Sequence, residues 1–190
     1  MKARCPLKGV IFTEFLGLVE QIGGFELGDG VITAAGLDGA YTALGNYPYE
    51  ELVALVEQLS LRLGQPVAVL LEQFGRHLFG RFLQLYPDLF RDHRDAFALL
   101  ARLDDTIHVE VRKLYPEATP PRFECRLDGD SMELVYTSVR PFADLARGLL
   151  NACLEGYGEG IEVHEQDARG DRRQVRFDLR RQELVRVTPA

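Results

Sequence analysis

The chain has 190 residues, of which 46% are hydrophobic and 27% charged, and its 22 Lys and Arg residues against 29 Asp and Glu residues give a formal net charge of −7. This ordinary globular composition excludes bulk disorder, and the acidic balance argues against nucleic acid as a partner, because phosphate binding requires a basic field. The longest aliphatic run, residues 67–71, is far shorter than the roughly 20 apolar residues that cross a bilayer, and no signal-peptide pattern is present. We therefore expect a cytoplasmic protein with no membrane or nucleic-acid partner.

The first two-thirds of the chain place apolar residues at helical spacing. Helices are expected over residues 11–22, 48–63, 66–82 and 94–114. Gly23-Gly24 is expected to end the first helix and Gly64 the second, since glycine commonly follows a helix. Pro66 opens the third helix, because proline is well tolerated in the first helical turn.

The pattern changes after Thr119-Pro120-Pro121. Alternating polar and apolar residues predict strands over residues 123–127, 132–139, 161–163 and 175–179, with a further short strand near 184–187. Asp128-Gly129-Asp130 is typical of a hairpin turn. Pro141 starts a helix that ends before the glycines at 156, 158 and 160. The expected fold class is α+β, with a helical N-terminal portion packed against a roughly four-stranded antiparallel sheet and its helix.

The usual catalytic motifs are missing from the sequence. There is no His-Glu-x-x-His, no Gly-x-Ser-x-Gly and no phosphate-binding glycine loop, so we do not expect an enzyme. The acidic pairs Asp104-Asp105 and Glu50-Glu51 are interpreted as solvated helix faces or charges at helix N-termini. The three cysteines Cys5, Cys125 and Cys153 are scattered and odd in number, which excludes a disulfide framework.

His108 is the first candidate for chemistry. At 100° per residue it lies about 60° around the helix from Val111 and about 80° from Leu100, so it borders the apolar stripe. A half-buried core histidine bonded to a carbonyl is the simpler interpretation. An imidazole on a rigid helix beside an apolar pocket is also what an axial iron ligand requires.

The second candidate is the segment Tyr136-Thr137-Ser138-Val139-Arg140. Strand alternation would place Tyr136, Ser138 and Arg140 on one face. A phenol, a hydroxyl and a guanidinium in a row form a donor array suited to carboxylates, and arginine can bind one bidentately. The alternative is an ordinary solvent-facing side of a strand.

Together these features resemble the haem–nitric oxide/oxygen binding (H-NOX) family, in its bacterial stand-alone form related to the haem domain of soluble guanylate cyclase. Tyr-x-Ser-x-Arg begins 28 residues after the helical His108, with Ala-Thr-Pro-Pro-Arg between them. The similarity extends over Lys8-Gly9-Val10-Ile11-Phe12, Gly45-Asn46-Tyr47-Pro48, Phe74-Gly75-Arg76 and Leu114-Tyr115-Pro116, and onward to Leu179.

The resemblance implies a single domain over residues 1–190. A distal helical subdomain would span about residues 8–65, and proximal helices with the sheet about 66–190. Haem b (iron protoporphyrin IX) would lie between them. By this similarity His108 is the proximal ligand of the haem iron, Tyr136, Ser138 and Arg140 hold the propionates, and Pro121 presses on the porphyrin and distorts it.

The distal pocket implied by the resemblance is apolar. Members that hold oxygen stably place a tyrosine five residues after the motif arginine, where this chain has Leu145. The other matching positions, Ile11, Phe15 and Leu78, are apolar too. Bound oxygen benefits from a hydrogen-bond donor and nitric oxide does not, so we expect binding of nitric oxide and carbon monoxide. An oxygen-binding sensor of the same family is the alternative.

The implied mechanism is a weakening of the bond between iron and His108 when nitric oxide binds, which frees the histidine's helix to shift. The signal would pass in trans to a histidine kinase or a cyclic-di-GMP enzyme. Two features depart from the family pattern: residues 1–7 precede Lys8-Gly9, and only Cys153 and His164 are available for the zinc site of some members, so no zinc is expected. A haem-free or thiol-based redox interaction domain is the rival class.

Overall fold

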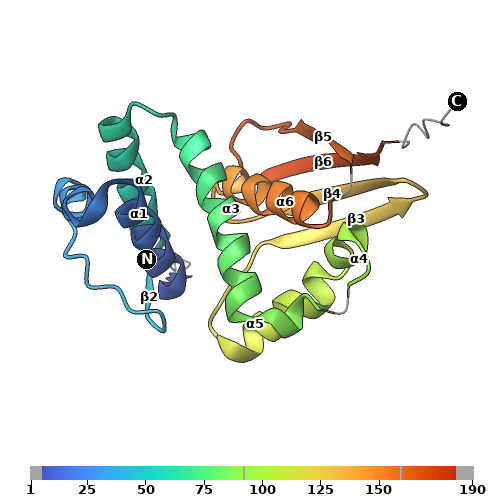
Figure 1. Ribbon diagram of the computed structural model, residues 1–190, viewed down its shortest axis with the longest axis horizontal. Helices are drawn as coiled ribbons and strands as arrows, with labels where there is room; N and C mark the ends of the chain where they lie inside the picture. Colours follow the sequence, from blue (N-terminus) through green and yellow to red (C-terminus); the bar gives the residue numbers. More distant parts are fainter. Residues whose placement is uncertain (1–5, 92, 159, 183–190) are drawn as a thin grey trace, which may run out of the picture.

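The computed structural model describes residues 6–182 apart from 92 and 159. Helices α1 and α2 form one end of the molecule, and α3 runs between them and a twisted sheet whose face is covered by α6 (Figure 1). The four-stranded sheet is antiparallel, as the sequence predicts, and the fold class is α+β. The short strand expected near residues 184–187 lies outside the described residues.

The N-terminal part begins with the strand β1 (Pro6–Lys8), which pairs antiparallel with β2 (Asn46–Pro48). Between them, α1 runs over Gly9–Ala35. Gly23-Gly24 ends the first helical segment of α1, as predicted: Gly23 has a φ of −141° and Gly24 a φ of 75°, and neither is helical. Glycine adopts the positive φ without strain, and a second helical segment, which the sequence did not predict, follows at once within the span of α1.

Helices α2 (Tyr49–Leu63) and α3 (Val67–Leu85) are separated by Gly64, whose φ of 64° ends α2 as predicted. Their apolar stripes and that of α1 form a first core, centred on the fully buried Phe12, Leu52 and Phe74. Within the described residues no single helix is long and apolar enough to cross a membrane; α2 and α3 meet that test only together, and they are bent by 112°.

The single helix expected over residues 94–114 is broken into pieces. A 3-10 turn (Pro87–Leu89) precedes α4 (Ala96–Leu100), then a π-helical turn (Leu103–Ile107) leads into α5 (His108–Leu114). A π turn widens the helix by one residue and is frequent at functional sites. The spacing of apolar residues located this helical region correctly. The wider turn rotates the side chains that follow it relative to their positions on the single helix that was expected.

The sheet has the strand order β3-β4-β6-β5, formed by Arg122–Asp128, Ser131–Thr137, Gln174–Arg181 and Ile161–Gln166 respectively. Alternate residues of β4 and β6, such as Leu134 and its partner Phe177, are fully buried. They face α6 (Ala143–Gly156) and form a second core. The division of the chain near residue 65 stays a prediction, and α3 contributes Leu78 to the first core and Phe79 to the second.

Candidate functional site

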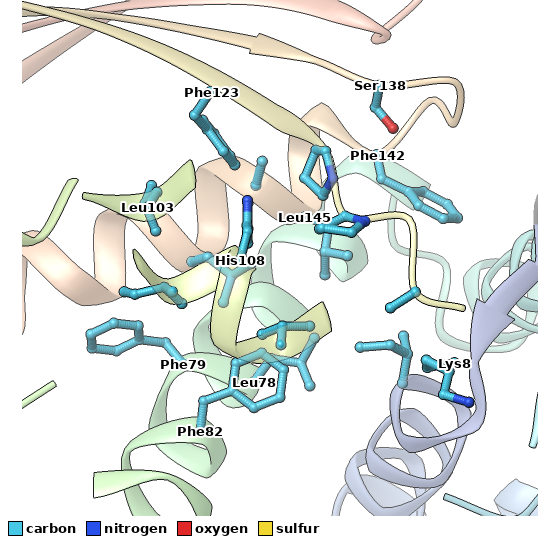
Figure 2. Close-up of a pocket in the computed structure, with 18 of the residues that line it drawn as sticks. Lys8, Leu78, Phe79, Phe82, Leu103, His108, Phe123, Ser138, Phe142 and Leu145 are labelled. Carbon is cyan, nitrogen blue, oxygen red and sulfur yellow. The ribbon is translucent and has the colours of Figure 1, made fainter. Parts of the chain in front are cut away.

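A cavity of about 280 Å³ lies between the two cores. Its walls come from β1, the start of α1, α3, the π turn with α5, the Thr119–Pro121 segment, the sheet and α6. Figure 2 shows the aromatic and aliphatic side chains that surround it, with His108 among them. Most of the lining is apolar, and polar groups enter it at a few places only.

His108 lines this cavity at the first position of α5, directly after the π turn. Its Nδ1 lies 2.7 Å from Asp104 Oδ1, one π turn earlier. Burial lowers the pKa of His108 below its ordinary value, although the hydrogen bond to Asp104 acts in the opposite direction. A neutral imidazole whose Nδ1–H donates to a carboxylate has its lone pair on Nε2, which is the form that binds a metal.

Asp104 lies in the first turn of the π-helical segment, as one of the two interpretations expects, but it is not part of a solvated helix face. Its second oxygen, Oδ2, accepts a hydrogen bond from the backbone N–H of Phe123 at 3.0 Å, so the carboxylate connects the π turn to β3. The neighbouring Asp105 is exposed, as predicted. The spacing of four residues between Asp104 and His108 is a signal that sequence reasoning had available, because side chains so spaced share a helix face.

The polar end of the cavity includes Tyr136, Ser138 and Arg140, and the structure brings all three together. They are not three alternate residues of one strand, because β4 ends at Thr137. Ser138 and Arg140 lie in the bend that follows, where Ser138 Oγ accepts a hydrogen bond from the Arg140 backbone N–H at 3.1 Å. The solvent-facing alternative is excluded, since Tyr136 is 2% exposed and Arg140 is 3% exposed.

The guanidinium of Arg140 binds two segments that are distant in the sequence. Nη1 donates to the carbonyl of Thr119 at 2.8 Å, and Nη2 donates to the carbonyl of Pro6 at 2.7 Å. Burial raises the pKa of Tyr136, and hydrogen bonding to Ser138 partly offsets that rise. A buried cation beside two hydroxyl groups is a suitable end for a ligand with carboxylates at one edge.

Pro121 and three of the four distal candidates line the cavity: Ile11, Leu78 and Leu145. Phe15 does not. It is 1% exposed and packs in the first core, with its ring centroid 5.2 Å from that of Phe74. The helical spacing of residues 11 and 15 places both on one face of α1, but only the first turn of that helix reaches the cavity.

Two cavity hydroxyls were not anticipated from the sequence. Tyr86, at the end of α3, and Tyr115, after α5, both line the cavity, and their hydroxyl oxygens lie 2.8 Å apart. Burial and this contact raise the pKa of Tyr86 to about 12. Tyr115 belongs to the family segment Leu114-Tyr115-Pro116, but no local pattern in the sequence indicates that it contacts a residue 29 positions earlier.

The cysteines give little support to thiol chemistry. Cys153 is buried in the second core, and burial raises the pKa of the half-buried Cys125 thiol, which lowers its thiolate fraction. Cys5 lies outside the described residues. Within the part of the chain that the structure describes, no group of three or more His, Cys, Asp or Glu side chains is placed to hold a metal ion.

An apolar cavity with an anchored imidazole on its wall is suited to haem, because a histidine is a common protein ligand of haem iron. The family model described as haem-NO-binding matches residues 8–165. The chain therefore belongs to the H-NOX family of haem-based gas-sensor domains. No curated protein sequence matched the chain.

Solved H-NOX structures share the whole fold. The unliganded Fe(II) H-NOX protein from K. algicida is 33% identical with a TM-score of 0.88, and the match covers 96% of this chain and 100% of that one. The H-NOX from Shewanella woodyi, solved with IWP-051 in the Fe(II)CO state, is 35% identical over 93% of this chain and 95% of its own, with a TM-score of 0.80. The Fe(II)NO form of an H-NOX protein from S. oneidensis is 25% identical over 93% and 99%, with a TM-score of 0.85.

Proposed function

We propose that this chain senses nitric oxide and carbon monoxide through haem b bound in the cavity, with His108 as the axial ligand of the iron. One observation supports the proposal above all others. His108 lines an apolar cavity while a carboxylate holds its Nδ1, so Nε2 is the nitrogen left for a metal. Two of the relatives named above were solved with a gas on Fe(II): nitric oxide in the S. oneidensis protein and carbon monoxide in the Shewanella woodyi protein.

The polar groups of the cavity suit the two carboxylates of a haem. A carboxylate is a stronger acceptor than a peptide carbonyl, so in this proposal the propionates take over donors of Arg140 that now bind Thr119 and Pro6. The Tyr136 and Ser138 hydroxyls lie at the same end. Pro121 lines the cavity next to β3 and would press on the porphyrin, as the family resemblance implies.

The apolar side chains of Ile11, Leu78 and Leu145 support selectivity for nitric oxide and carbon monoxide. They offer no hydrogen bond to a bound gas, and nitric oxide needs none. When bound, haem would supply the iron that takes the gas, and His108 would hold that iron. On the protein side, Asp104 holds the Nδ1 of His108 and also joins the π turn to β3, so a change at His108 would reach both α5 and β3.

A change in the position of α5 affects another protein only if that protein prefers one of the two arrangements. We propose a histidine kinase or a cyclic-di-GMP enzyme as that partner. The support is the family resemblance, and the test is whether nitric oxide changes the activity of the purified partner in the presence of this chain.

The decisive experiment replaces His108 with glycine. We expect purified wild-type protein to show a Soret band and a haem b pyridine haemochrome spectrum, and His108→Gly to lose haem unless imidazole is supplied. His164→Gly is the matched control, because His164 is exposed on β5. An unchanged spectrum in His108→Gly without imidazole would refute the assignment of the ligand.

Oxygen binding is the second candidate function, and the hydroxyl pair of Tyr86 and Tyr115 favours it. In a pair of hydroxyls one donates to the other, and the second O–H can donate elsewhere. A ferrous–oxygen spectrum that persists in air, and is lost in Tyr86→Phe, would favour this function. Absence of that spectrum in the wild-type protein would leave nitric oxide and carbon monoxide as the ligands.

A further inference from the structure

The carboxylate of Asp104 lies between two donors from different elements. Oδ1 is 2.7 Å from His108 Nδ1, and Oδ2 accepts the Phe123 backbone N–H at 3.0 Å. The side chain of His108 is 13% exposed and that of Asp104 28% exposed, so the pair is largely shielded from water. The ring of His108 also packs near that of Phe123, with centroids 5.8 Å apart.

We propose that Asp104 is a positioning residue that sets the strength of the bond between His108 and the haem iron. The inference rests on the proposed function of His108. An anionic acceptor on Nδ1 fixes the tautomer and the orientation of the imidazole, and it makes Nε2 a stronger electron donor to a metal. The same carboxylate is fixed to β3 through Phe123, so it cannot follow a rotating imidazole freely.

The π turn makes this arrangement possible. It separates Asp104 from His108 by one wider turn, and the α5 helix begins at the histidine itself. The Asp104 carboxylate therefore contacts both His108 Nδ1 and the Phe123 backbone N–H of β3. An exposed carboxylate one residue further along, Asp105, has the same charge and none of these contacts among the described residues.

The test is resonance Raman spectroscopy of the ferrous, ligand-free haem protein. We expect Asp104→Asn to lower the frequency of the iron–histidine stretch, because the amide is a neutral and weaker acceptor. Haem transfer to apomyoglobin should also become faster, and outer-shell substitutions of this kind reduce metal affinity by about 10–100-fold. Asp105→Asn removes the same charge nearby and should leave both the stretch and the transfer rate unchanged.

A purely structural role for Asp104 would change stability without moving the stretch. If Asp104→Asn folds and its stretch equals that of the wild type, the proposal is wrong while His108 remains the ligand. If Asp104→Asn does not fold, Asp104→Glu keeps the charge but displaces the carboxylate from Nδ1. Its stretch must then also fall, and an unchanged value overturns the proposal. Absence of any iron–histidine stretch in the wild-type protein would instead refute the proposed function.

Discussion

Gly148 allows α3 and α6 to cross with their backbones in contact. A Cβ added there would lie 2.8 Å from the carbonyl carbon of Glu72 and closer still to its carbonyl oxygen, and a Cβ on Gly75 would meet Gly148 Cα at 2.9 Å. Backbone atoms cannot move aside as the end of a side chain can. Gly148→Ala should therefore force the two helices apart by more than about 0.6 Å, the shift that restores an ordinary 3.4 Å contact with the carbonyl carbon, because the carbonyl oxygen is nearer still.

The magnitude follows from two opposing effects. Overpacking against backbone costs about 3 kcal/mol, the upper end of the usual range, and the better helix propensity of alanine returns about 1 kcal/mol. The free energy of unfolding should thus fall by about 2 kcal/mol, which lowers the Tm of a chain of this size by roughly 4–8 °C. Because Leu78 and Leu145 lie on these two helices and line the cavity, the cavity should widen as well.

The assay is urea denaturation followed by far-ultraviolet circular dichroism, with Gly80→Ala as the matched control. Gly80 lies in α3, and a Cβ there would meet nothing within 4 Å. That substitution should stabilise the protein by about 1 kcal/mol. The changes in the free energy of unfolding of the two variants should therefore have opposite signs. A Gly148→Ala protein as stable as Gly80→Ala would refute the claim that backbone contact sets the spacing of α3 and α6.

Two further substitutions test other parts of the structure. The hydrogen bond that Arg81 donates to Glu14 at 2.7 Å, joining α3 to α1, lowers the pKa of Glu14 from its ordinary value of 4.5. A carboxyl whose folded-state pKa is lowered stabilises the fold above its ordinary pKa and loses that effect as the pH falls through the lowered value. At pH 7 the free energy of unfolding of Glu14→Gln should therefore be about 1 kcal/mol or less below that of the wild type. Denaturation measured at acid pH should show no such difference. An equal difference at acid pH would contradict the ion pair. Leu145→Tyr adds a hydroxyl to the cavity and should raise oxygen affinity about tenfold or more, measured from spectra in air, and unchanged affinity would show that residue 145 does not face the bound gas.

Most elements of the fold were predictable because their signals are local. The apolar stripes of α2 and α3, the glycine after α2 and the alternation in β4 all act over a few residues, and each predicted the observed element. The errors arose where local signals were ambiguous. Gly23-Gly24 ends a helical segment as predicted, but the second segment that follows was not predicted, and its burial of Val31 in the first core depends on tertiary packing.

The candidate site was likewise predictable only in part. His108 and Arg140 were identified by residue type and spacing, and the structure places both at the cavity. Phe15 was assigned there as well, but how far a helix face extends along a cavity depends on the packing of neighbouring helices. The sequence indicates only a solvated or N-terminal helix charge at Asp104, because the π turn that directs its side chain inward has no clear sequence signature.

The sequence by itself determined the fold class, the family and the residue types of the candidate site, because a motif such as Tyr-x-Ser-x-Arg specifies chemistry without requiring coordinates. Only the tertiary structure decided which groups meet across the chain: Asp104 with Phe123, and Tyr86 with Tyr115. The physical reason is that these contacts join residues 19 and 29 positions apart. The geometry of these contacts depends on how α3, α5 and β3 pack around one cavity, and the spacing of residues in the sequence does not indicate that packing.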